Sequence, residues 1–143
     1  KPFIINDYPE LCVELGADGV HVGGTDAAVA AVRALVGPER IVGASCYGTF
    51  ELAQAAQQAG ASYVAFGGFY PSRIKKYELS TPVEIVSRAR DGLAVPNVVI
   101  GGMTRENSAP LVTAGADMVA VISSVYFADD PEAAAREMTG LFV

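Results

Sequence analysis

The chain has 143 residues, of which 51% are hydrophobic and 18% are charged, so it has the size and composition of one globular domain. Its 16 acidic and 10 basic residues give a formal net charge of −6 at pH 7. Without a block of Lys and Arg this balance argues against nucleic-acid binding, and no apolar run approaches the roughly 18 residues of a membrane span.

The cysteines and the start of the chain are informative about the cellular location of the protein. Cys12 and Cys46 lack the spacing of metal ligands, and a reducing environment explains them better than a single disulfide. No signal sequence is visible, although the chain starts at Lys1 rather than Met. We therefore expect a cytoplasmic protein.

A phrase containing Gly-Ala occurs three times, at residues 15–20, 59–64 and 114–119. Each copy ends an Ala-rich, helix-like segment with a glycine and then starts a short β-branched run. Glycine supplies the left-handed backbone that closes a helix, and the alanine lets the returning chain pack closely. Each copy of the phrase therefore marks a place where a helix ends and the next strand of a βα repeat begins.

Short apolar segments rich in Val and Ile are typical of buried parallel strands, and they occur at residues 3–6, 19–23, 41–45, 63–68, 97–101 and 118–123. Helical segments separate or follow them at residues 9–15, 27–36, 50–59, 81–90, 107–114 and 131–141. This alternation predicts one α/β domain with a parallel sheet and right-handed crossovers, as a (β/α) barrel or a doubly wound sheet. The segment 67–80 has neither the periodicity of a helix nor that of a strand, and we interpret it as a functional loop.

Polar residues collect directly after the strands. In a parallel α/β fold these positions converge on one rim, where ligands bind. Asp7 and Asp26 follow adjacent strands, so their carboxylates could share one Mg²⁺, which uses one or two carboxylates and fills its shell with water and phosphate. The alternative is that both aspartates only cap helices.

The ends of the last two strands suggest a phosphate site. Gly101-Gly102 and Ser123-Ser124 offer backbone N–H groups and hydroxyls, and tight turns without a ligand are the alternative. Lys75 and Lys76 in the long loop could reach a polyphosphate, or they form a solvated surface pair. His21 is interpreted as a hydrogen-bonded interior residue rather than a general base, and Cys46 as incidental to the chemistry.

Together these residues resemble the thiamine-phosphate synthase family of TIM-barrel enzymes. The resemblance runs in the family's order over nearly the whole chain and is specific as a set. Its motifs are Phe3-Ile4-Ile5-Asn6-Asp7, Gly19-Val20-His21-Val22-Gly23 with Asp26, Gly43-Ala44-Ser45, Ala65-Phe66-Gly67-Gly68-Phe69-Tyr70-Pro71-Ser72 with Lys75-Lys76, Ile100-Gly101-Gly102-Met103-Thr104 with Asn107, and Val119-Ala120-Val121-Ile122-Ser123-Ser124 with Asp129-Asp130-Pro131.

The resemblance implies a transferase of thiamine biosynthesis that joins a pyrimidine methyl diphosphate to a thiazole phosphate and releases pyrophosphate. It assigns Mg²⁺ as the cofactor and Asp7 and Asp26 as its ligands. Two residues with expected catalytic roles, Lys75 and Ser45, bind the pyrimidine diphosphate together with Asn6. The thiazole phosphate is assigned to Ser72, Arg73, Ile74, Gly102, Ile122 and Ser123.

The resemblance also implies a (β/α)8 TIM barrel, of which residues 1–143 form a single domain with six βα units. We expect this chain to hold strands three to eight, with the first two units missing upstream of Lys1. A homo-oligomer is compatible with the sequence. A thiazole tautomerase of the same superfamily is the nearest rival, and a non-catalytic phosphate-binding barrel fragment is a third interpretation.

Overall fold

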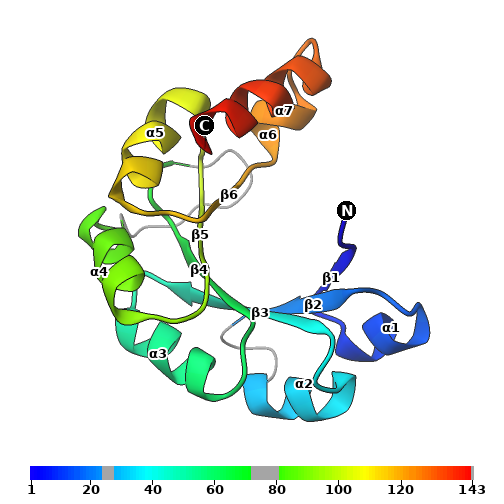
Figure 1. Cartoon of the computed structure of the whole chain (residues 1–143). Helices are drawn as coiled ribbons and strands as arrows, with labels where there is room; N and C mark the ends of the chain where they lie inside the picture. The colour runs from blue at the N-terminus through cyan, green and yellow to red at the C-terminus, as the bar shows by residue number, and fades with distance from the viewer. Residues whose placement is uncertain (24–27, 72–80, 143) are drawn as a thin grey trace.

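The sheet curls into a half-barrel with the helices on its outer side (Figure 1). The structure, a computed structural model, describes residues 1–23, 28–71 and 81–142. All strand pairs are parallel, and the strands lie side by side in chain order. The strands are β1 (Ile4–Asn6), β2 (Gly19–Val22), β3 (Ile41–Tyr47), β4 (Tyr63–Gly67), β5 (Asn97–Ile100) and β6 (Met118–Ala120). The helices are α1 (Pro9–Glu14), α2 (Val29–Val36), α3 (Phe50–Gln58), α4 (Glu84–Gly92), α5 (Arg105–Ala114), α6 (Ser123–Tyr126), α7 (Pro131–Thr139) and the 3-10 turn η1 (Gly140–Phe142).

The predicted six-strand alternation is confirmed, but α6 was not predicted and several element boundaries differ by a few residues. Hydrogen bonds explain two of these differences. The strand predicted at residues 118–123 ends at Ala120, because the chain turns at Ile122 and its carbonyl accepts hydrogen bonds from the N–H groups of Val125 and Tyr126 in α6. The helix predicted from residue 81 starts at Glu84. Thr81 is held outside it, because its N–H donates to Gly68 O and its hydroxyl donates to Gly67 O.

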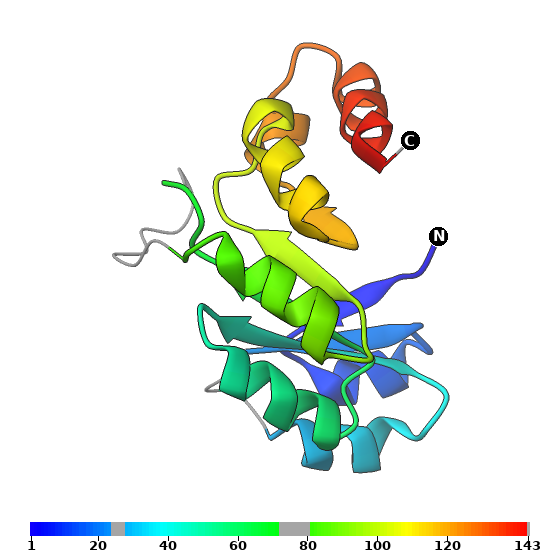
Figure 2. The same cartoon turned by 60° about the vertical axis from the view of Figure 1, so that its left-hand side comes forward.

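The two faces of the sheet carry different side chains because successive residues of a strand alternate. The outer face packs against the helices, as Figure 2 shows, and holds the core. The inner face carries His21, Gly43, Ser45 and Tyr63. Polar chemistry therefore lies on the concave side. The largest fully buried core side chains include Phe66, Leu111, Val20, Val22, Val42, Val64 and Val99.

The repeated Gly-Ala phrase closes α1, α3 and α5 and starts β2, β4 and β6. Its glycines all have positive φ, at 62° for Gly16, 97° for Gly60 and 113° for Gly115. The alanine after each glycine is 5% exposed. In each copy this alanine's N–H donates back to a carbonyl in the helix just ended, as the left-handed helix ending requires. The three bonds join Ala17 to Cys12, Ala61 to Ala56 and Ala116 to Leu111.

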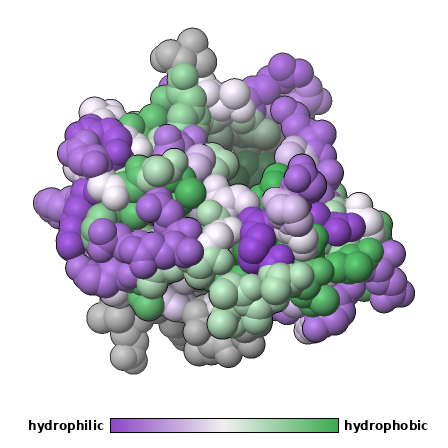
Figure 3. Space-filling model, turned by 60° about the horizontal axis from the view of Figure 1, so that its bottom comes forward, coloured by the Kyte–Doolittle hydropathy of each residue, from purple (hydrophilic) through white to green (hydrophobic). Residues whose placement is uncertain are grey.

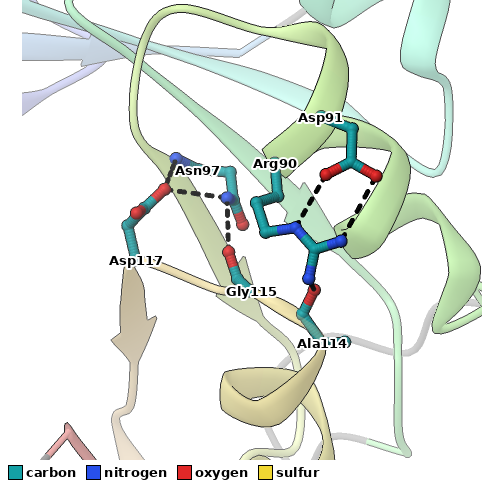
Figure 4. Close-up of polar contacts among 6 residues, drawn as sticks. All are labelled: Arg90, Asp91, Asn97, Ala114, Gly115 and Asp117. Carbon is teal, nitrogen blue, oxygen red and sulfur yellow. Dashed lines mark hydrogen bonds and ion pairs between the residues drawn. The ribbon is translucent and has the colours of Figure 1, made fainter.

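The residue after each alanine makes a reciprocal pair of hydrogen bonds with the neighbouring strand, which we call a strand clasp. Its side chain accepts the N–H of a residue within one position of the start of that strand, and its own N–H donates to the same residue's carbonyl. Asn97 and Asp117 form the third clasp, with the N–H of Asn97 2.8 Å from the Asp117 carboxylate (Figure 4). The clasps pair Phe3 with Asp18, Val42 with Ser62, and Asn97 with Asp117.

An arginine also donates to a carbonyl within each copy of the phrase. Arg33 contacts Gly60 O with both Nε, at 3.0 Å, and Nη2, at 2.8 Å. Arg90 donates to Ala114 O while its guanidinium pairs with Asp91 (Figure 4), and Arg40 donates to Ala17 O. Ala114 O is the last helical carbonyl of α5, which has no partner within the helix, whereas Gly60 O and Ala17 O belong to the turns after α3 and α1.

Replacing Gly115 with alanine should destabilise the protein by about 1–3 kcal/mol, because φ is positive there and an added Cβ meets the Arg90 side chain. Urea unfolding followed by circular dichroism measures the effect. Gly140→Ala is the matched control, since Gly140 has φ −63° and open space around it. There the substitution should be neutral or stabilise by up to about 1 kcal/mol. Equal effects at the two sites would contradict this account of the phrase.

Asp117→Ala should lower the free energy of unfolding by about 1–3 kcal/mol, because it removes the acceptor of two N–H donors of the buried Asn97. Asp91→Ala is the control: it also removes a carboxylate paired in Figure 4, but an exposed one. We expect its urea midpoint to stay near that of the parent. A larger loss for Asp91→Ala would mean that the surface pair, not the clasp, fastens this end of the sheet.

Candidate functional site

A cavity of about 710 Å³ runs along the inner face of the sheet to the carboxyl ends of the strands. The surface is hollowed in Figure 3, with hydrophobic side chains inside the hollow. The structure brings together in this cavity every predicted site residue that it describes. They are Asn6, Asp7, Ser45, Gly102, Ile122 and Ser123. The other predicted site residues, Asp26, Ser72, Arg73, Ile74 and Lys75, lie outside the described residues.

The end of β1 presents a carboxylate to the cavity rim. Asp7 has φ 70°, a left-handed conformation that Asp adopts more readily than most residues, and its N–H donates to His21 O at 2.8 Å. Asn6 Nδ2 lies 2.6 Å from the Asp7 carboxylate. The N-cap of α1 is Tyr8, and no side chain caps that helix. Asp7 is therefore not the helix cap that the alternative interpretation requires.

The described residues contain no cluster of three or more His, Cys, Asp or Glu side chains that could hold a metal. A single exposed carboxylate at the cavity rim still suits Mg²⁺, which binds hard oxygen ligands and keeps several of its waters. Of the cavity-lining residues that the structure describes, Asp7 is the one with a carboxylate, and this donor fits such an ion.

The middle of the cavity wall holds a hydrogen-bonded trio from β2, β3 and β4. His21 Nδ1 lies 2.9 Å from Tyr63 Oη, and its Nε2 lies 2.9 Å from Ser45 Oγ. The His21 and Tyr63 rings stack with centroids 5.5 Å apart. Burial raises the pKa of Tyr63 above its usual value. His21 is hydrogen-bonded through both ring nitrogens, as predicted, but it is half-buried and lines the cavity.

Beyond Ser45 the strand β3 turns sharply. Cys46 points to the opposite face and is 1% exposed, and burial raises the pKa of its thiol to about 11. The pairing with β4 shifts register between Ser45 and Tyr47, and Tyr47 has φ 50°. A β-bulge of this kind re-aims a side chain, and Tyr47 lines the cavity. Cys46 is buried as an inert thiol, in agreement with its interpretation as incidental.

The ends of β5 and β6 form the opposite rim. Gly101 and Gly102 have φ 111° and 64°, and a Cβ on Gly102 would overlap the carbonyl oxygens of Tyr70 and Pro71. Tight turn geometry is therefore one reason for these glycines, and the phosphate site remains a prediction. The short helix α6 starts at Ser123, and among the described residues the buried Ser124 Oγ has no hydrogen-bond partner.

Tyr63 and Tyr47 are cavity residues that the sequence reasoning missed. For Tyr63 a signal was available, because the strand predicted at residues 63–68 alternates with the buried Val64 and Phe66, which places Tyr63 on the inner face with Ala65. Tyr47 lies two residues after Ser45, so the same alternation places it on the inner face, but the strand was predicted to end at residue 45 instead of Tyr47.

Comparisons with known proteins agree with one another. The family described as thiamine monophosphate synthase matches residues 1–125. Thiamine-phosphate synthase of Janthinobacterium sp. is 64% identical over 141 residues, which cover 99% of this chain and 68% of that protein. The enzyme of the same name from Thiobacillus denitrificans is 49% identical over 141 residues, covering 99% of this chain and 67% of its own length.

The solved structures include a similar chain, thiamine phosphate pyrophosphorylase from Pyrococcus furiosus. It superimposes with a TM-score of 0.85 at 28% identity, over 99% of this chain and 67% of that one. This chain thus spans about two thirds of the length of the relatives that it matches. None of the helices in the described ranges is long and apolar enough to cross a membrane. On the extent of the family match and the identity to curated relatives, the chain belongs to the thiamine monophosphate synthase family.

Proposed function

We propose that the protein is a thiamine-phosphate synthase, a transferase that joins a pyrimidine methyl diphosphate to a thiazole phosphate and releases pyrophosphate. One observation carries the proposal: the six described residues that the family resemblance assigns to metal and substrates all line a single cavity. They lie at the end of β1, in β3, directly after β5 and β6, and at the start of α6, so their convergence depends on the fold rather than on nearness in sequence.

We propose that the chain corresponds to strands three to eight of an eight-stranded barrel. Its six strands pair only with their neighbours in chain order, and β1 and β6 are the outer strands of the sheet. The share of the relatives' length that the chain covers supports this assignment. The cavity described above is then the interior and carboxyl rim of that barrel.

The metal assignment rests on Asp7 at the cavity rim, with Asp26 as the proposed second ligand. Asn6 donates to the Asp7 carboxylate and so fixes its orientation toward the cavity. When bound, Mg²⁺ neutralises negative charge on the departing pyrophosphate. Lys75 has the same proposed role, as a cation that stabilises the leaving group.

The proposed reaction does not require a side chain that transfers a proton. The aminopyrimidine delocalises the positive charge left on its methylene when pyrophosphate departs, and the thiazole nitrogen is already a nucleophile. Ser45 faces the cavity and supplies a neutral hydroxyl for the pyrimidine diphosphate. Cys46 is turned away and its thiol stays protonated at neutral pH. A site without a strong base suits this reaction.

The opposite rim has the proposed role of holding the thiazole phosphate. Gly102 and Ser123 lie there, and Ile122 adds an apolar side chain beside them. The short helix α6 begins at Ser123, and barrels commonly build a phosphate site from such a helix and the loops after their last two strands. Ser72, Arg73 and Ile74 are proposed to complete this subsite.

Asp7→Asn should lower the rate of pyrophosphate release from the two substrates by about 100-fold or more and raise the Mg²⁺ concentration needed for half-maximal rate. A coupled pyrophosphate assay on the intact protein measures both quantities. Asp91→Asn is the matched control, because that carboxylate is exposed and does not line the cavity. Unchanged Mg²⁺ dependence in Asp7→Asn would remove the metal assignment. Isomerisation of the thiazole without pyrophosphate release would favour a tautomerase instead.

Iodoacetamide at pH 8 should leave the activity of the native protein unchanged. With a pKa of about 11, only about one Cys46 thiol in a thousand is ionised at pH 8, and the side chain is buried. The ionised share rises as the pH approaches 11. Mass spectrometry of the treated protein, with and without urea, measures alkylation of both cysteines. Rapid alkylation of native Cys46 with loss of activity would show a reactive thiol in the site.

A further inference from the structure

We propose that Tyr63 and His21 act as positioning residues that fix the direction of the Ser45 hydroxyl, so that Ser45 donates its hydrogen to the diphosphate of the bound pyrimidine substrate. The identity of that substrate rests on the proposed function. The orientation of the trio rests on geometry alone.

The backbone register builds the Tyr63–His21 contact across an intervening strand. His21 of β2 pairs with Gly43 of β3, and Gly43 pairs with Tyr63 of β4, so the three residues lie in one row. A Cβ on Gly43 would overlap Cζ and Oη of Tyr63 and come within contact of His21 Nδ1. Glycine in the central strand is therefore what lets the two side chains meet above it, two strands apart.

The hydrogen bonds of this row have a direction that follows from Tyr63. Among the described residues, its hydroxyl has a single hydrogen-bond partner, His21 Nδ1 at 2.9 Å. A largely buried hydroxyl hydrogen needs an acceptor, and the raised pKa of Tyr63 keeps that hydrogen in place at neutral pH and above. Tyr63 thus donates to Nδ1, and a neutral imidazole must then carry its own proton on Nε2.

The same proton assignment decides what Ser45 does. Nε2–H of His21 donates to Ser45 Oγ over 2.9 Å, so the hydroxyl oxygen is already an acceptor and its hydrogen is left for a different partner. Ser45 lines the cavity together with Asp7. A hydrogen bond from this hydroxyl to an anionic diphosphate oxygen is charge-assisted and stronger than a neutral one.

The orientation is tested by nitrogen NMR on the intact protein carrying labelled histidine and no histidine tag. The sequence printed here contains one histidine, His21, and the ring signals that disappear in His21→Gln are assigned to it. At pH 8 we expect the Nε2–H tautomer, and in Tyr63→Phe a larger share of the Nδ1–H form. An Nδ1–H tautomer in the parent protein, or a ring with protons on both nitrogens, overturns the proposal. This readout needs no substrate.

The consequence for binding is tested by calorimetry with the pyrimidine diphosphate in the presence of Mg²⁺. Ser45→Ala and His21→Leu should each weaken binding by about fivefold to tenfold, and the double variant should be no weaker than either one. His21→Gln keeps an N–H donor near the Nε2 position and should stay within about threefold of the parent. Tyr63→Phe should have no effect in the Ser45→Ala background.

Additive losses in His21→Leu and Ser45→Ala, or failure of His21→Gln to restore binding, would show that His21 only packs the wall. Thermal unfolding of each variant separates that effect from global destabilisation. A parent protein that binds neither the pyrimidine diphosphate nor inorganic pyrophosphate would contradict the proposed function. The tautomer measurement would still decide the orientation of the trio.

Discussion

The reciprocal hydrogen bonds of the strand clasps are the constraint on which the rest of the structure depends. Each clasp fixes where an even-numbered strand begins relative to the odd-numbered strand beside it, and parallel pairing carries that register to the carboxyl end. Because side chains alternate along a strand, a slip of one residue would exchange the inner and outer faces. His21, Gly43 and Tyr63 would then face the helices, and the core valines would face the cavity.

Much of the fold followed from the sequence because its signals are local. Each strand is a short apolar run between a turn and a polar rim residue, and the glycine of each phrase requires the left-handed backbone that the structure shows at Gly16. Boundaries set by contacts distant in sequence were not predictable. Thr81 stays out of α4 because of carbonyls at Gly67 and Gly68, and the turn at Ile122 follows from a backbone conformation that the residue types do not specify.

The candidate site, like the fold, was predictable from the sequence only in part. Residues at strand ends, such as Asn6 and Asp7, were found because topology alone brings the ends of parallel strands together. The hydrogen bonds of the trio in the cavity wall were missed, since they depend on two side chains that meet across a glycine in the strand between them. Tyr47 was missed because the third strand was predicted to end at residue 45, two residues before its end in the structure. Sequence patterns thus predicted the residues at the mouth of the cavity. The contacts in its deeper wall depend on the register of three strands, which those patterns do not give.

The order of the strands has a consequence for how the molecule forms. Every strand pairs with its neighbour in the chain, and the three clasps join residues only 15, 20 and 20 positions apart. Loops of this length cost less chain entropy to close than pairing between strands far apart in the chain would. Each strand clasp can therefore form within one pair of consecutive strands, without contacts to the rest of the half-barrel.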